Sequence, residues 1–314
     1  MLRHNVTTNE RDAETSMATT TLTPQPVVSG ESHVELADGR RLGYTTYGAD
    51  HGPVAIVLDG PASRGLARAA AAPAAAIGVR LVAPDRPGVR SSTPAPDRGI
   101  ADWPADHAAL LDALGVQRAG ILSQSGGTPY AVAVAAALPR RTIALAGLGP
   151  VAPFDDPASV RELGGELRTA VALARHAPWL LAALLRALSR AAARDPEKTA
   201  RRVARDMPPA DARVLEDPAL WAVHEQATAE ILGQPRAIAH EIGLLSRPWG
   251  VDAADVRVPV SLWSGSRDTR HPTSQARRLA AGIPGDVAVH VVPDAATFGL
   301  MAIYAQALRF ATAG

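Results

Sequence analysis

Ser125 has the sequence surroundings of a nucleophile. An apolar run, residues 119–122, precedes it, and a turn of very small residues followed by a helix start, residues 126–130, comes after it. A nucleophile elbow has this order, because a sharp turn pushes one hydroxyl out of the backbone and needs small residues two positions before and after the serine. Ser123 and Gly127 meet that demand. The pattern S-x-S-G-G therefore predicts a serine presented at the tip of a strand-to-helix turn.

The elements that must position this serine begin with an antiparallel hairpin. Residues 33–36 and 41–48 flank a turn at 37–40, which is typical of two paired strands. The apolar runs 53–58 and 78–83 follow, separated by an alanine-rich helical segment. Strands that alternate with helices favour a parallel sheet.

The same alternation continues to the elbow and beyond. We expect a helix over 102–114, the elbow strand over 118–122, a helix over 126–138 and a strand over 142–149. From about residue 155 to 240 the pattern is helical and rich in Ala, Arg and Leu, without strands. Strands resume at 258–265 and 287–292, and a last helix is expected over 298–311. The predicted organisation is a disordered tail (1–30), a core (31–154), a helical cap or lid insertion (155–245) and the rest of the core (246–314).

From residue 31 to 314 this order resembles the α/β-hydrolase fold family, which has a mostly parallel doubly wound sheet and an inserted helical cap. Residues 85–88, Asp-Arg-Pro-Gly, with two serines at 91–92, look like the family's D-R-P-G-x-G-x-S loop. Residues 263–268 are similar to its W-x-G-x-x-D segment, and residues 293–300 to its P-x-x-G-H-F loop. The resemblance implies that Ser125 is the nucleophile and Asp268 the acid, in the family's chain order.

The family's histidine position is occupied by Thr297. Threonine cannot accept a proton near neutral pH, whereas a serine hydrolase needs an imidazole to take the Oγ proton and return it to the leaving group. His271, three residues after Asp268 on the loop expected to carry the acid, is the best candidate substitute. The alternative for His271 is a residue that faces solvent or caps the next helix.

A second departure lies at the oxyanion loop, where relatives carry H-G-x-P-G and this chain has Asp59-Gly60-Pro61. Pro61 has no N–H to offer a developing oxyanion, which leaves the N–H of Gly126. Asp59 could act as a base in a proton transfer that needs no acyl-enzyme. It could equally cap the local turn through nearby amides.

By descent, these features predict a serine-type ester or acyl hydrolase acting on a small apolar substrate, with conventional activity weak or absent. One alternative is a small-molecule-binding module without catalysis. Another is a repurposed enzyme for cyclisation, isomerisation or elimination that uses Asp59 or His271.

The composition of the chain disfavours several other classes of protein. The chain of 314 residues is 47% apolar and 20% charged, with a formal net charge of +1. This profile, without a basic block interleaved with aromatics, disfavours nucleic-acid binding. With no cysteine, disulfides and thiolate chemistry are excluded. We also expect a cytoplasmic protein without membrane association, because no secretory signal or spanning segment is apparent. Neither a metal-ligand spacing nor a G-x-G-x-x-G motif occurs, so no metal or cofactor is expected.

Overall fold

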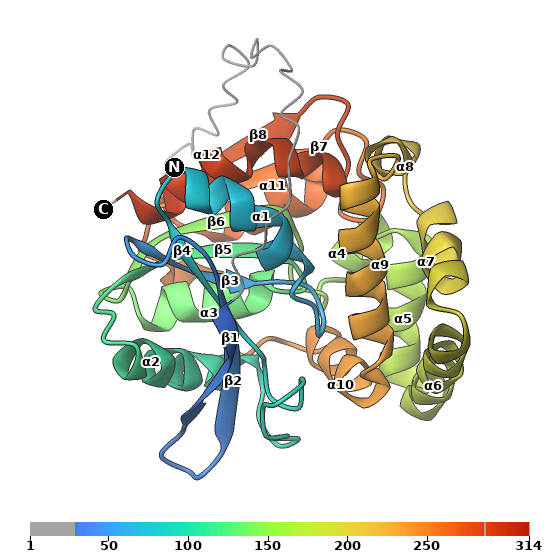
Figure 1. The fold of residues 1–314 in the computed structure, drawn as a ribbon, viewed down its shortest axis with the longest axis horizontal. Helices are drawn as coiled ribbons and strands as arrows, with labels where there is room; N and C mark the ends of the chain where they lie inside the picture. Colours follow the sequence, from blue (N-terminus) through green and yellow to red (C-terminus); the bar gives the residue numbers. More distant parts are fainter. Residues whose placement is uncertain (1–28, 286, 314) are drawn as a thin grey trace.

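A single eight-stranded sheet forms the centre of the protein (Figure 1). The computed structural model describes residues 29–285 and 287–313. The strand order is β1-β2-β4-β3-β5-β6-β7-β8, in which β2 is antiparallel to β1 and β4 and the other neighbouring pairs are parallel. The strands are β1 (Ser29–Glu35), β2 (Arg41–Gly48), β3 (Val54–Leu58), β4 (Arg80–Pro84), β5 (Ala119–Ser125), β6 (Thr142–Pro150), β7 (Val260–Gly265) and β8 (Val287–Val292).

The predicted hairpin and parallel strands are all present. Residues 1–28 of the predicted disordered tail (1–30) lie outside the described residues. Ser29 and Gly30 belong to β1, so the prediction is wrong at these two positions. The helix expected over 298–311 starts as a 3₁₀ helix, η3, and becomes α-helical only at Tyr304.

Helices cover both faces of the sheet. The alternation of side chains along β3 shows how, because Ala55 and Val57 pack with α1 and α12, whereas Ile56 and Leu58 pack with α2 and α3. These core helices and the short 3₁₀ helices are α1 (Gly65–Ala76), η1 (Ile100–Asp102), α2 (Trp103–Ala113), α3 (Thr128–Ala137), η2 (Ala253–Asp255), α11 (Thr273–Gly282), η3 (Phe298–Ile303) and α12 (Tyr304–Thr312).

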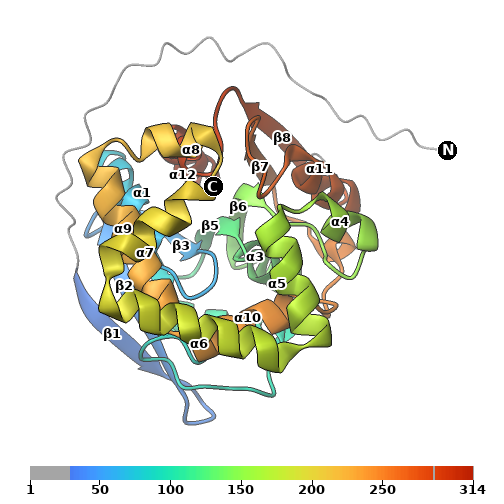
Figure 2. The same cartoon turned by 90° about the vertical axis from the view of Figure 1, so that its right-hand side faces the viewer.

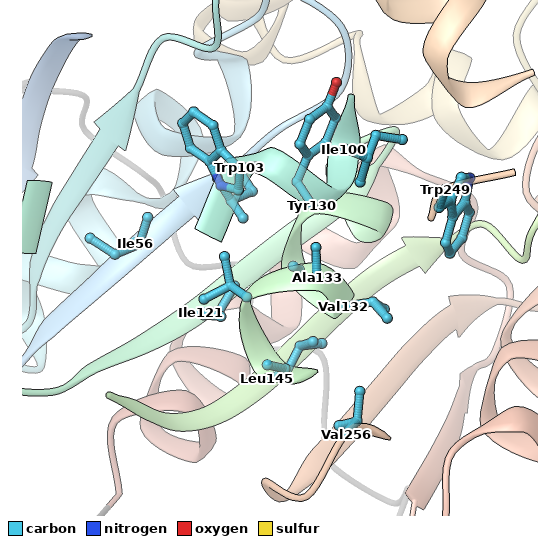
Figure 3. Packing of buried hydrophobic residues seen from close by; sticks show 14 of the residues in the cluster. Ile56, Ile100, Trp103, Ile121, Tyr130, Val132, Ala133, Leu145, Trp249 and Val256 are labelled. Carbon is cyan, nitrogen blue, oxygen red and sulfur yellow. The ribbon is translucent and has the colours of Figure 1, made fainter. Parts of the chain in front are cut away.

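The layer between the sheet and helices α2 and α3 contains large aromatic and aliphatic side chains (Figure 3). Trp103 and Tyr130 meet edge to face there, with ring centroids 6.0 Å apart. Figure 3 shows the Tyr130 hydroxyl directed away from the other labelled side chains. The Arg86 guanidinium lies 4.6 Å from the Tyr130 ring centroid, so this ring joins the apolar layer to a charged side chain.

Seven α-helices lie between β6 and β7, before the 3₁₀ helix η2, and we call residues 157–245 the helical insertion. They fall where the helical segment 155–245 was predicted, and in Figure 2 they lie in front of the carboxyl ends of β3, β5 and β6. Glu230 in the insertion forms ion pairs with Arg68 and Arg90 of the core. The insertion helices are α4 (Pro157–Glu162), α5 (Gly165–His176), α6 (Pro178–Arg194), α7 (Pro196–Arg205), α8 (Pro209–Val214), α9 (Pro218–Leu232) and α10 (Pro235–Leu245).

The topology brings four loops to one edge of the sheet. Strands β3, β5, β6, β7 and β8 are parallel neighbours, so their carboxyl ends meet at this edge. In open α/β sheets, ligands bind in the crevice outside these ends. The loops after β3, β7 and β8 carry Asp59, Asp268 and Thr297, respectively, and Ser125 is the last residue of β5, where the fourth loop begins.

Candidate active site

Ser125 lies at the last position of β5 in a strained turn. Its φ of 49° is in the left-handed region, which L side chains seldom adopt and which is found at nucleophile elbows. Gly127 is required for the same turn, because a β-carbon there would lie 1.9 Å from the carbonyl oxygen of Leu58. The half-buried Ser125 hydroxyl thus leaves the backbone at the edge where the four loops meet.

The closest partner of this hydroxyl is His271. The distance from Ser125 Oγ to His271 Nε2 is 2.8 Å, which is a hydrogen bond, and the imidazole is buried. His271 comes from the loop after β7, which returns the chain toward β5 before α11 begins. A neutral imidazole at this distance can accept the Oγ proton, which is the task of a general base.

Asp268 is bonded on both of its carboxylate oxygens. Oδ1 accepts the backbone N–H groups of Arg270 and His271, each at 2.9 Å, and Oδ2 accepts the hydroxyl of Thr297 at 2.7 Å. Burial by itself would raise the pKa of Asp268, but the interactions with His271 and with the Thr297 hydroxyl outweigh it and lower the pKa to about 2. The carboxylate is therefore ionised at neutral pH.

The contact between the acid and the imidazole is electrostatic. Asp268 Oδ2 lies 3.7 Å from His271 Nδ1, which is too far for a hydrogen bond. In the described part of the chain Nδ1 is buried without a hydrogen-bond partner. Thr297 instead makes the bond to Oδ2 and anchors the acid from the β8 side. The structure thus brings Ser125, His271, Asp268 and Thr297 into one chain of contacts.

Asp59 caps the first helix with both oxygens. Oδ1 accepts the N–H of Gly60 at 2.6 Å, and Oδ2 accepts the N–H of Leu66, in the first turn of α1, at 2.9 Å. These are the local amide contacts of a capping carboxylate. They favour the capping interpretation of Asp59 over a base facing Ser125.

The loop after β3 offers few donors to an oxyanion. The Gly60 N–H donates to Asp59, Pro61 has no N–H, and the Ala62 N–H donates to Glu241 Oε2 at 3.3 Å. Nevertheless the loop lies against the elbow, because a β-carbon at Gly126 would lie 3.2 Å from Pro61 Cδ. Gly126, next to Ser125, keeps the backbone N–H that the elbow supplies.

Sequence reasoning missed a buried ion pair behind this loop. Arg86 donates to both carboxylate oxygens of Glu241 in α10, with Nη2 2.7 Å from Oε2, and to the carbonyls of Asp59 and Gly60 at 3.0 and 2.9 Å. Its guanidinium lies 4.6 Å from the ring centroid of Tyr130. A signal was present, since Glu241 adjoins Ile242 on the buried face of its helix, and a charged residue there requires a partner.

The other histidines with described contacts make other bonds. His290 in β8 stacks on Trp263 at 4.9 Å and is hydrogen-bonded to Ser261 at 2.8 Å. His224 in α9 lies 3.2 Å from the carbonyl oxygen of Ala200. Across the residues described, no cluster of three or more His, Asp or Glu side chains could hold a metal ion. Nor is any helix within 29–285 and 287–313 long and apolar enough to cross a bilayer.

One protein family matches most of the chain. A family model described as the alpha/beta hydrolase fold matches residues 60–301, well over half of the chain. A search of curated protein sequences gave no significant match.

Solved structures are similar over nearly their whole lengths. A hydrolase from Pseudomonas aeruginosa PA01 has a TM-score of 0.65 at 20% identity, covering 90% of this chain and 97% of its own. An enol-lactonase from Burkholderia xenovorans LB400 has a TM-score of 0.62 at 19% identity, covering 89% and 99%. The esterase RhEst1 from Rhodococcus sp. ECU1013 has a TM-score of 0.64 at 19% identity, covering 90% and 98%. At these identities the likeness shows the fold.

Proposed function

The chain belongs to the α/β-hydrolase fold family, and on that premise we propose that it is a serine-type hydrolase of carboxylic esters whose base is His271. The observation that supports this most directly is the 2.8 Å hydrogen bond between Ser125 Oγ and His271 Nε2. The base would then sit three residues after the acid Asp268, while Thr297 fills the family's histidine position.

In the proposed reaction Ser125 Oγ attacks the ester carbonyl carbon as His271 Nε2 takes its proton. The tetrahedral intermediate collapses, the bond from carbon to the alcohol oxygen breaks, and the imidazolium returns the proton to that oxygen. Water then attacks the acyl-enzyme, again giving a proton to His271, and the acid product leaves as Ser125 regains its proton. Asp268, ionised and 3.7 Å from Nδ1, stabilises the imidazolium by its charge in both halves.

The oxyanion site is the weak part of this machinery. Gly126 supplies one N–H, whereas the loop after β3 has lost the second donor at Pro61. Removal of one such donor costs about 10² to 10³ in kcat in a serine protease. We therefore propose turnover that is weak but depends on the serine, rather than an inert site.

The proposed substrate is a small ester or lactone with an apolar acyl group. An apolar cluster joins Ala62 of the oxyanion loop and Val89 to Leu181 and Ile242 of the helical insertion, and Leu245 lies beside Gly126. These side chains are buried against one another, so the insertion covers the oxyanion loop with apolar groups, as a lid over a small apolar acyl group would. An esterase and an enol-lactonase are among the structurally similar proteins, which supports this substrate class.

The test combines labelling with turnover. We expect a fluorophosphonate probe to label wild-type protein at Ser125 and short p-nitrophenyl esters to be hydrolysed slowly. Ser125→Ala should abolish both, and His271→Ala should lower turnover roughly 10³-fold or more, because among the described residues no other base is hydrogen-bonded to Oγ. His176→Ala, at an exposed position of the insertion, is the matched control and should leave turnover unchanged.

Other outcomes would support the alternative functions of the site around Ser125. Tight binding of a small molecule without turnover or labelling would contradict the hydrolase proposal in favour of a binding module. Turnover that survives Ser125→Ala but not Asp59→Asn would contradict it in favour of non-hydrolytic chemistry.

A further inference from the structure

Helix α10 of the insertion reaches the elbow with two residues that are one turn apart. Leu245 Cδ1 lies 3.2 Å from the position that a β-carbon of Gly126 would occupy. Glu241, four residues earlier and therefore on the same helix face, is buried behind the oxyanion loop. The insertion thus borders Gly126, the residue that follows the nucleophile and carries the remaining oxyanion donor.

Glu241 and Arg86 together bind three of the four residues 59–62 of the oxyanion loop. Glu241 accepts the Ala62 N–H at 3.3 Å, and Arg86 donates to the carbonyls of Asp59 and Gly60. Because Arg86 also donates to both oxygens of Glu241, the carboxylate does not face the site as an unpaired negative charge. The loop is therefore held by this buried ion pair, together with Arg90 Nη1 and Gln234 Nε2, which donate to the Ala62 carbonyl at 3.5 and 3.4 Å.

The bonded loop is strained where Glu241 holds it. Ala62 has a φ of 52°, which is unfavourable for an L residue and persists only where surrounding contacts impose it. Pro61, the residue before it, has its ring against Gly126. Relaxation of Ala62 would move Pro61 relative to the Gly126 N–H and change the space in which an oxyanion forms.

We propose that Glu241 is a positioning residue for the oxyanion site, acting through Ala62 and Pro61 on the space beside the Gly126 N–H. The inference rests on the proposed esterase function, and it makes the helical insertion part of the catalytic machinery as well as a cover. Glu241 touches neither the substrate nor the reacting atoms. Its effect should fall on the step in which charge develops, hence on kcat more than on KM.

The experiment compares Glu241→Asp with Glu162→Gln in the full chain. Glu241→Asp keeps a negative charge opposite Arg86 but withdraws the carboxylate from Ala62 by one methylene. We expect kcat for a short p-nitrophenyl ester to fall roughly 10- to 100-fold, within the range for lost oxyanion stabilisation, with KM changed less than about 3-fold. The rate of fluorophosphonate labelling should fall by a similar factor, because phosphonylation also develops charge on the oxygen.

Glu162→Gln is the matched control, because Glu162 in α4 also joins an insertion helix to a core arginine, Arg278, and neither side chain is hydrogen-bonded to residues 59–62. It should lower Tm without lowering kcat. If both variants lose kcat in proportion to their loss of Tm, or if Glu241→Asp leaves kcat unchanged, the positioning role is wrong.

Should Glu241→Asp fail to fold, Ala62→Gly supplies the second test. Glycine relieves the strain at φ 52° without touching the ion pair, and it should lower kcat by freeing the loop. An unchanged kcat in Ala62→Gly would overturn the proposal. Wild-type protein that a fluorophosphonate does not label at Ser125 would overturn the proposed function and this inference together, whereas a labelled wild type with unaffected variants would overturn the inference alone.

Discussion

Asp211→Asn is expected to stabilise the protein at neutral pH and to remove part of its pH dependence. Asp211 lies in α8 and is buried, and it accepts the backbone N–H of Phe298 at 2.7 Å, next to Thr297. Burial raises the pKa of Asp211 from 3.8 to about 6. The bonds from Phe298 and Gly299 and the charge of Arg270 oppose this rise, and the charge of Asp268 adds to it.

The sign of the effect follows from the raised pKa. Between pH 3.8 and about 6 the folded protein holds a proton on Asp211 that the unfolded chain has lost, so the free energy of unfolding falls as pH rises through this window. Above about pH 6 Asp211 is ionised in both the folded and the unfolded state, and the free energy of unfolding has fallen by its full amount. A rise of about two units, at about 1.4 kcal/mol each, amounts to about 3 kcal/mol. Asparagine removes this cost but turns one amide N–H₂ toward backbone donors, so we expect a net gain of about 1 to 3 kcal/mol near pH 8.

Thermal unfolding measured from about pH 4 to pH 8 tests this value. For a chain of this size 1 kcal/mol shifts Tm by roughly 2 °C, so Asp211→Asn should unfold up to about 6 °C higher near pH 8 and show little gain near pH 4. Asp206→Asn, at an exposed position close by in the insertion, should track the wild type at every pH. A variant that is less stable than wild type by the same amount at all pH values would refute the reasoning, because it would show that Asp211 acts only as a hydrogen-bond acceptor.

Two further predictions concern the acid and the base. Asp268→Asn should lower kcat/KM by about 10² to 10³-fold, which is less than the ~10⁴ seen where the acid hydrogen-bonds the imidazole. The loss should be smaller here because Asp268 Oδ2 lies 3.7 Å from His271 Nδ1 and does not fix the tautomer of the imidazole. A pH profile of kcat/KM measures this loss, and a loss of 10⁴ or more would contradict the prediction. Added to His271→Ala, Thr297→His should restore part of the ester hydrolysis and of the fluorophosphonate labelling, because the side chain at position 297 already bonds the acid. A double variant as inactive as His271→Ala would mean that the loop after β8 no longer reaches Ser125.

The fold could be predicted because its signals are local. Apolar runs such as residues 53–58 mark strands that are buried on both faces. A glycine is found two positions after Ser125 because a side chain at position 127 would clash with the Leu58 carbonyl. Each of these patterns is complete within a few residues. The family match over residues 60–301 confirms the fold that they indicated.

The base and the ion pair at the site depend on contacts that a linear pattern does not carry. His271 was the best candidate substitute, but a residue three positions after the acid faces Ser125 only if the turn after Asp268 folds back, and the amide bonds to Asp268 Oδ1 impose that turn. Glu241 and Arg86 are 155 positions apart, and the residues around each of them do not indicate that the two side chains pair. Such pairs follow from the topology and become visible only in three dimensions.

The two departures from the family pattern differ in how easily the fold compensates for them. A base needs a single nitrogen within hydrogen-bond distance of Ser125 Oγ, and any loop at the carboxyl edge of the sheet can supply it, as His271 does from the β7 side. An oxyanion donor must be a backbone N–H on a loop that already lies against the elbow, and there Pro61 cannot donate while Ala62 donates to Glu241. A changed side chain therefore costs this site less than a changed backbone. The slow step of the proposed reaction should accordingly be formation of the tetrahedral intermediate, where one N–H does the work of two.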